Sequence, residues 1–302
     1  MLGRRTDLAL EAKEIWEEGA AEAAVLEGVE AASGEREGFP TETVHILDRR
    51  GEEALGKPVG RYVTLTLDGL ARREEGAFGR AARAVAGELA GLLEGVPAGG
   101  LALVGYQGAA YLLARRRLLR GAQPGTEEER AQLAALAAEL GALLGLAPGA
   151  PALVVGLGNR AITPDNIGPK AADQTMVTRH LVERVPEHFG SFRPVAALAA
   201  GVLGTTGMES GELVQAVCRR LKPACVVAVD ALASRSLKRL CRTVQLSDTG
   251  IAPGSGVGNH RAALDRASLG VPVLAVGVPT VVDGATLAAD LLGTAELPPL
   301  GE

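Results

Sequence analysis

The sequence predicts an α/β fold, with a mostly parallel sheet covered by helices on both faces and an N-terminal β/α extension. From residue 151 onward, short apolar runs alternate with amphipathic segments, which is the order of parallel strands and crossover helices. The apolar runs lack polar alternation, as expected of strands buried on both faces. With 302 residues, 47% of them hydrophobic, the chain can form this core as one domain over 1–302.

The N-terminal extension contributes strands and a helix. Val63, Leu65 and Leu67 alternate with polar residues, which predicts a half-buried strand, and 43–47 is its expected partner. Apolar residues spaced by four and three from Phe78 to Leu92 predict an amphipathic helix with Phe78 in the core.

Residues 96–150 are rich in Ala, Leu and Gly and predict a helical insertion within the domain. Thr126 and Glu129 have capping-box spacing before a leucine-rich helix. The arginine run at 114–120 is typical of a solvated helix face, and it also suits docking of an acidic substrate or subunit.

Strands and helices alternate after residue 151. The expected strands are 152–157, 195–200, 225–230, 243–247 and 271–278, and the expected helices are 171–183, 209–221, 234–240 and 285–292. In open sheets of this kind a ligand binds beyond the carboxyl ends of the strands. The five segments that follow the strands are rich in Gly, Thr, Asn and Asp, so we expect them to meet at one edge as a site.

Composition excludes several classes of protein. The formal net charge of −5 gives no attraction to nucleic acid. The three cysteines, Cys218, Cys225 and Cys241, lack CxxC spacing, which argues against a zinc cluster or a disulfide framework. The charged N-terminus lacks the apolar segment of a signal peptide. We therefore expect a cytoplasmic protein with no nucleic-acid and no membrane partner.

Three familiar site types do not fit. Gly156, Gly158 and Ala161 match a loose dinucleotide-binding pattern, but Pro164 falls where that pattern needs a helix interior. The four histidines form no HExxH motif, so an ordinary zinc peptidase site is not expected. Ser255 lies on a glycine-rich turn without an assignable histidine partner.

The strongest candidates for chemistry are Asp165 and Asp230, each of which follows or ends an apolar run. Two carboxylates at one sheet edge can divide acid and base roles around a water, or can hold a divalent metal. Alternatively, each caps a helix. No cofactor is expected apart from that possible metal. The polar and glycine residues proposed to bind substrate at this edge are Asn159, Thr205, Ser255 and Gly256.

Several motifs together resemble the germination protease family of endospore-forming bacteria. They are RTDLALEAKE near the N-terminus, GRYVTL, GLGNRAITPDNIGP, TRHL, DALASRS, QLSDTGIAPGSGVGN and GVPTVVDGATLAAD. The resemblance implies an endopeptidase that degrades small acid-soluble spore proteins during germination, with a core similar to that of hydrogenase maturation proteases. It places the catalytic pair on Asp165 in TPD and Asp230 in DALA.

The resemblance also implies a cytosolic zymogen that loses a short propeptide and assembles as a homotetramer. It leaves the chemistry open between an atypical aspartic and a metallo mechanism. The sequence departs from the family pattern in that only Met1 to Arg4 precede RTDLA, that 96–132 has no recognised counterpart, and that the chain ends at Glu302. The alternatives are a metal-dependent maturation-type endopeptidase that uses the same aspartates and a noncatalytic oligomeric binding protein.

Overall fold

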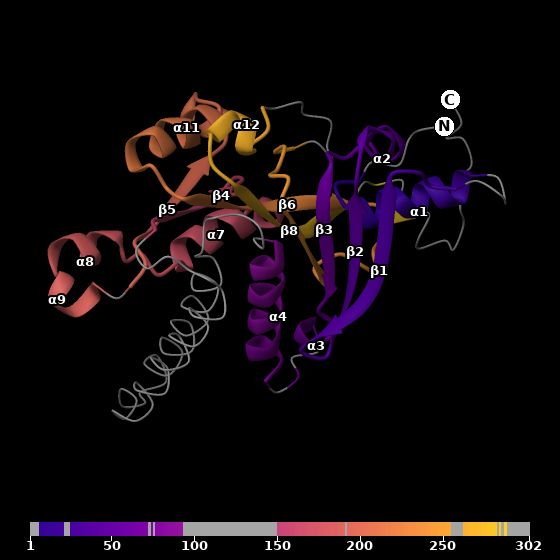
Figure 1. Ribbon diagram of the computed structural model, residues 1–302, viewed down its shortest axis with the longest axis horizontal. Coiled ribbons are helices and arrows are strands. Elements are labelled where there is room, and N and C mark those ends of the chain that lie inside the picture. Colours follow the sequence, from indigo (N-terminus) through magenta and orange to yellow (C-terminus); the bar gives the residue numbers. More distant parts are fainter. Residues whose placement is uncertain are drawn as a thin grey trace.

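One mixed sheet organises the described part of the chain (Figure 1). The computed structural model describes residues 6–20, 25–71, 74, 76–92, 150–190, 192–254, 262–282, 284, 287 and 288. Its eight strands lie in the order β1-β2-β3-β7-β8-β6-β4-β5. The predicted α/β class is confirmed. The predicted insertion over 96–150 and the predicted helix over 285–292 lie almost wholly outside the described residues.

The N-terminal strands form the antiparallel half of the sheet. β1 (Val29–Arg36), β2 (Phe39–Ile46) and β3 (Gly60–Thr66) pair in sequence, and β3 pairs antiparallel with β7 (Thr243–Ser247). The turn between β1 and β2 holds Glu37 and Gly38 at φ 54° and 79°, the left-handed conformation of a tight hairpin. The helices of this half are α1 (Ala9–Gly19), α2 (Arg49–Leu55), α3 (Asp68–Ala71) and α4 (Ala77–Leu92).

The C-terminal half is the parallel part. β5 (Val195–Gly201), β4 (Ala152–Leu157), β6 (Cys225–Ser234) and β8 (Val273–Val282) run parallel to their neighbours, and β7 joins β8 antiparallel. The connecting helices are the 3-10 turn η1 (Thr163–Asp165), α7 (Ile167–Gln174), α8 (Arg179–Arg184), α9 (Pro186–Phe189), α10 (Leu203–Thr206), α11 (Ser210–Leu221) and α12 (Arg266–Leu269). None of the helices in the described part of the chain has the length and apolar character needed to cross a bilayer.

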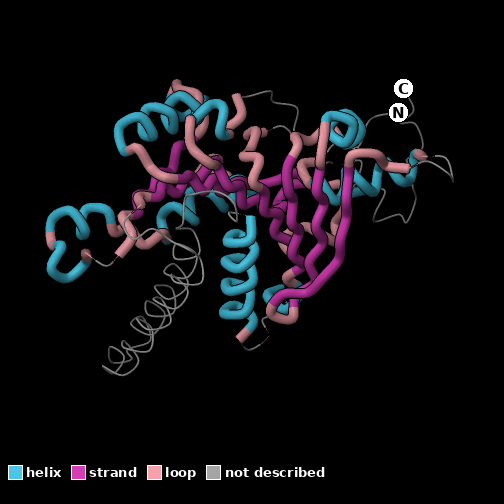
Figure 2. The backbone as a smooth tube through the Cα atoms, viewed as in Figure 1, coloured by secondary structure: helices cyan, strands magenta, loops and turns pink. Residues whose placement is uncertain are grey.

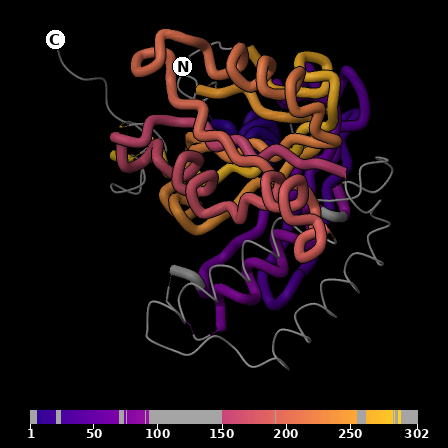
Figure 3. Tube along the Cα trace, turned by 90° about the vertical axis from the view of Figure 1, so that its left-hand side faces the viewer, coloured from indigo at the N-terminus to yellow at the C-terminus, as the bar shows by residue number. Residues whose placement is uncertain are grey.

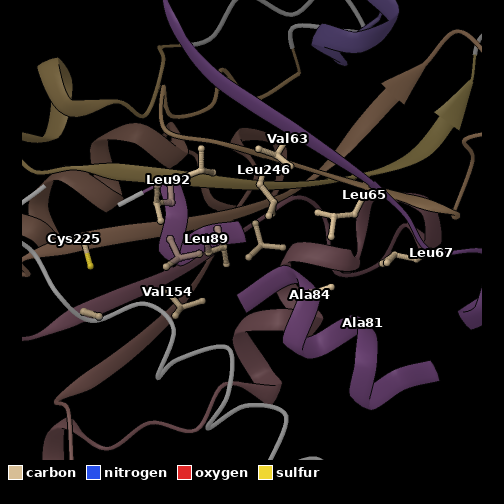
Figure 4. Packing of buried hydrophobic residues seen from close by; sticks show 14 of the residues in the cluster. Val63, Leu65, Leu67, Ala81, Ala84, Leu89, Leu92, Val154, Cys225 and Leu246 are labelled. Atoms are coloured by element: carbon tan, nitrogen blue, oxygen red, sulfur yellow. The ribbon is translucent and has the colours of Figure 1, made fainter. Parts of the chain in front are cut away.

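Helices cover both faces of the sheet, as predicted (Figure 2). On one face, Leu89 and Leu92 of α4 pack with Val154 of β4 and Leu246 of β7 (Figure 4). On the other face, Val214 and Cys218 of α11 pack with alternate β4 residues, including Leu153 and Val155. The view turned by 90° keeps α11 (orange) above and α4 (purple) below the strands (Figure 3). The central strands are thus buried on both sides.

Two predicted features of the helices are wrong. Phe78 is 42% exposed, and the buried residues of α4 are Ala77, Ala81, Ala84, Ala86, Leu89 and Leu92. The expected helix over 171–183 is interrupted between α7 and α8. There the fully buried Thr178 takes part in the sheet edge: its N–H donates to the carbonyl of Val195, and its hydroxyl accepts from the Val195 N–H at 3.0 Å.

The expected helix over 234–240 is also wrong, because β6 continues as a strand to Ser234. The residues after Asp230 pair with β8 up to Ser234–Val282, and a turn follows. This excludes the alternative in which Asp230 caps a helix. β8 likewise extends to Val282, four residues beyond the expected end at 278.

Candidate functional site

The two predicted aspartates lie where the ladder between β4 and β6 ends: Asp165 follows β4, and Asp230 lies within β6. The β4–β6 ladder ends at the pair Gly156–Val229, one residue before Asp230. Asp165 lies eight residues after the last residue of β4. In Figure 1, β4 and β6 lie next to each other above α7, the helix that follows Asp165.

Asp165 lies on the short turn η1 and is half-buried. Its Oδ2 accepts a hydrogen bond from the N–H of Asn159 at 2.7 Å. Gly158 makes this loop possible because its φ is 111°, and a Cβ there would come within 3.0 Å of both the carbonyl oxygen and a carboxylate oxygen of Asp165. Asp165 therefore orders its own loop instead of capping α7, whose N-terminal residue is preceded by Asn166.

Glycines bring the segment that carries Asp165 against β4 and β6. A Cβ at Gly168 would come within 3.0 Å of the carbonyl oxygens of Leu157 and Val229. A Cβ at Gly156 would likewise overlap the carbonyl of Gly168. Since side chains at these positions would separate the backbones, the glycines allow α7 to begin directly against the residue before Asp230.

Asp230 occupies a buried position within the sheet. It is 5% exposed and lies opposite Gly277 of β8. Its Oδ1 accepts a hydrogen bond from the N–H of Ala231 at 2.8 Å. A buried carboxylate needs such donors because desolvation is costly. The ladder with β8, which continues from Val229–Val276 to Ala231–Val278, fixes its backbone.

The four predicted substrate-binding residues divide into two groups. Asn159 lies beside Asp165, and its Oδ1 accepts from the N–H of Ala161 at 2.9 Å. Thr205 lies in α10, which follows β5, and its hydroxyl donates to the carbonyl of Val202 at 2.9 Å. Ser255 and Gly256 lie outside the described residues. The segment leading to them starts at the opposite edge, because β7 runs antiparallel to β8, so the expectation that all five segments leave from one edge is wrong.

Asn166 is a site residue that sequence reasoning missed. Its side-chain oxygen is buried and has no hydrogen-bond partner among the described residues. It directly follows Asp165, so this oxygen is an acceptor beside the candidate site that a water or a substrate N–H can satisfy. The signal in the sequence was the position of Asn166 in the PDN motif, directly after the candidate aspartate.

The N-terminal segment supports β6 beyond Asp230, which sequence reasoning also missed. Asp7 donates its N–H to the carbonyl of Ala233 at 2.9 Å and accepts the Ala233 N–H on Oδ2 at 2.8 Å. Glu11 is fully buried and accepts from the Ser234 hydroxyl and the Arg235 N–H, each at 2.7 Å. The signal in the sequence was the pair of acidic residues Asp7 and Glu11, four positions apart with apolar residues between them.

Lys57 completes this polar cluster around the N-terminal segment. Its ammonium donates to the carbonyl of Thr6 at 3.1 Å. Burial lowers the pKa of Lys57, while the charges of Asp7 and Glu11 oppose that shift. The cluster therefore holds buried charges of both signs at the far end of β6.

A zinc ion would need more protein ligands than the two aspartates supply. Within the described ranges, no group of three or more His, Cys, Asp or Glu side chains is placed to hold an ion. Structural and catalytic zinc sites usually have at least three protein ligands, whereas Mg²⁺ can be held by one or two carboxylates with waters. The chemistry of two carboxylates suits an acid/base pair or Mg²⁺, and zinc only with further ligands.

Comparison with known proteins gives the family. A family model described as germination protease matches residues 99–294. The germination protease of Caldanaerobacter subterraneus subsp. tengcongensis is 40% identical over 97% of this chain and 73% of its own length. That of Clostridium perfringens is 39% identical over 97% of this chain and 74% of its own length. That of Bacillus licheniformis is 36% identical over 95% of this chain and 66% of its own length. The chain therefore belongs to the germination protease family and is an endopeptidase.

Proposed function

We propose that this endopeptidase hydrolyses small acid-soluble spore proteins during germination and that Asp165 and Asp230 activate the attacking water. The observation that carries the proposal is the glycine-mediated contact of the Asp165 segment with β6, next to Asp230. It brings two carboxylate-bearing backbones together at the carboxyl edge of a parallel sheet, where α/β proteins bind their ligands.

The mechanism follows from the chemistry of paired carboxylates. Two carboxylates that share a site keep one proton between them, because both cannot ionise cheaply. The ionised member takes a proton from water as the water attacks the scissile carbonyl, and the protonated member donates to the developing oxyanion. The proton taken from water then passes to the leaving nitrogen as the C–N bond breaks, and a hydroxyl of the intermediate returns its proton to the other carboxylate, so that the pair again holds one proton.

The surroundings of the pair suit an extended substrate. The exposed loop of Asn159 and the α10 segment of Thr205 follow the adjacent strands β4 and β5. Both carry polar groups that can hydrogen bond to a peptide backbone. We propose that they bind the polypeptide on either side of the scissile bond.

Cellular context and assembly are part of the same proposal. The substrate assignment places the enzyme in the spore core. A homotetramer and an activation step that removes N-terminal residues follow from the family resemblance in the sequence motifs. Light scattering of the purified protein tests the tetramer, and N-terminal sequencing before and after activation tests the processing.

The central experiment is digestion of an acid-soluble spore protein by the wild type, Asp165→Asn and Asp230→Asn, each with and without EDTA. Loss of an acid/base group is expected to lower kcat by about 100-fold or more. Asp68→Asn is the matched control, because Asp68 lies at the start of α3 and its half-buried carboxylate makes a long ion pair with Arg242 at 4.0 Å. This variant should cleave normally.

Each outcome assigns a different chemistry. Wild-type rates in both aspartate variants would exclude the pair as the catalytic groups. Wild-type activity that EDTA abolishes and a divalent cation restores would establish the metal-dependent alternative. An oligomer that binds the spore protein without cleaving it would support the noncatalytic alternative.

A further inference from the structure

A β-bulge in β8 lies beside the two aspartates. Asp230 pairs with Gly277, and the ladder runs regularly to the pair Leu232–Pro279. The next pair is Ala233–Val281, so Thr280 is an extra residue on β8 with no partner in this ladder. Bulges often occur next to active sites, where they redirect a side chain out of the regular alternation.

The bulged residue contacts the turn that carries Asp165. The hydroxyl of Thr280 donates to the carbonyl of Pro164 at 2.7 Å. Pro164 is the residue before Asp165, so one hydrogen bond links β8, the neighbour of the Asp230 strand, to the peptide that enters Asp165. Thr280 is separated from Pro164 by 116 positions in the sequence.

The Asp165 turn needs such a contact because the sheet does not hold it. None of the three residues of η1 is buried. Its backbone hydrogen bonds are local: the N–H of Asp165 donates to Ile162 at 2.9 Å, and that of Asn166 donates to Thr163 at a long 3.4 Å. The Asn159 N–H and the close approach of Gly158 contact Asp165 from within its own loop, whereas the glycine contacts with the sheet fix the segment at position 168, three residues after Asp165.

We propose that Thr280 is a positioning residue for catalysis, which holds the Asp165 carboxylate in place relative to Asp230 through the Pro164 carbonyl. The proposal rests on the proposed function of the two aspartates. The hydroxyl of Thr280 takes no part in the chemistry. Its removal allows η1 to shift, and a misplacement of a catalytic group by about 1 Å can cost on the order of 100-fold in rate.

The test compares Thr280→Val with Thr175→Val. Valine keeps the shape of threonine but cannot donate. Thr175 is the matched control, because its hydroxyl donates to the carbonyl of Ala171 at 2.8 Å at the far end of α7. We expect Thr280→Val to lower kcat by about 10- to 100-fold with KM within twofold, roughly, of the wild type, whereas Thr175→Val keeps its kcat. Equal kcat values in the two variants would overturn the proposal.

Thr280→Ser and Thr280→Ala separate positioning from stability. Both lack the methyl group, but serine keeps the donor, so serine should restore most of the kcat and alanine should not. This comparison applies even if the valine variant folds poorly. Equal kcat in the serine and alanine variants would also overturn the proposal. If Asp165→Asn is inactive while Thr280→Val is fully active, only the role of Thr280 fails; if Asp165→Asn is active, the proposed function itself fails.

Discussion

The η1 turn and strand β6 hold the two candidate catalytic aspartates in different ways. β6 has ten residues, of which only Ala231 is not buried, and it pairs with β4 and β8 on its two sides. η1 has three residues, of which none is buried. The position of Asp230 therefore follows from the sheet, whereas that of Asp165 depends on a few backbone contacts made through glycine and on Thr280.

The largest effect is expected where the η1 segment meets the sheet. Gly168→Ala would bring a methyl group within 3.0 Å of the Leu157 and Val229 carbonyls. We expect α7 and the preceding Asp165 to move, so that kcat/KM for spore-protein cleavage falls about 100-fold. The free energy of unfolding should fall by about 1–3 kcal/mol, since overpacking costs this much.

Gly91→Ala is the control for that experiment. Gly91 lies in α4, outside the proposed substrate-binding segments, and a Cβ there would meet nothing within 4 Å. It should retain wild-type kcat/KM and thermal stability. A Gly168→Ala variant that matched this control would show that close backbone contact does not set the position of Asp165.

A second large effect is expected at the far end of β6. Glu11→Ala removes a fully buried carboxylate that pairs with Arg239 at 3.3 Å and accepts the Arg235 N–H. Breaking a buried pair from one side costs about 3–5 kcal/mol, so urea unfolding should show a loss of this size. Glu17→Ala, at an exposed pair with Lys13, should cost at most about 0.5 kcal/mol. Equal losses would mean that the N-terminal segment does not stabilise β6.

The contrast between regular strands and segments held by distant contacts also explains which elements could be predicted from the sequence. The bounds of β4 and β7 match the expected 152–157 and 243–247, because β4 is an apolar run after a proline and β7 alternates polar and apolar residues. β1 was not predicted, because its exposed sequence VEAASGER has no apolar alternation. It forms a strand because it pairs with β2.

Contacts between distant residues account for the other differences. The last residues of β6, Ala231 to Ser234, have helix-forming or neutral side chains, and they are strand because β8 and Asp7 pair with them. Asp7 and Ala233 are 226 positions apart. Asp165 and Asp230 could be selected from local patterns, whereas Thr280 gained a place in the site only through the three-dimensional packing.

The smallest expected effect concerns the buried start of β6. Burial raises the pKa of the Cys225 thiol to about 11 from an ordinary 9.0, although the charge of Arg193 opposes the shift. Above pH 9 the unfolded chain loses this proton while the folded chain keeps it, so the free energy of unfolding falls as the pH rises from 9 to about 11. At 1.36 kcal/mol per pH unit, this thiol accounts for a loss of about 2–3 kcal/mol.

Cys225→Ala isolates that contribution, because it removes the thiol and leaves every other titrating group. Urea unfolding between pH 8 and 11 should show a decline about 2–3 kcal/mol shallower than that of the wild type, even though the variant is less stable at pH 8 owing to the lost sulfur packing. Cys241→Ala, at an exposed cysteine, should reproduce the wild-type decline. Parallel curves for Cys225→Ala and the wild type would mean that water reaches the start of β6, and the contrast between a buried Asp230 strand and an exposed Asp165 turn would then be weaker than the packing indicates.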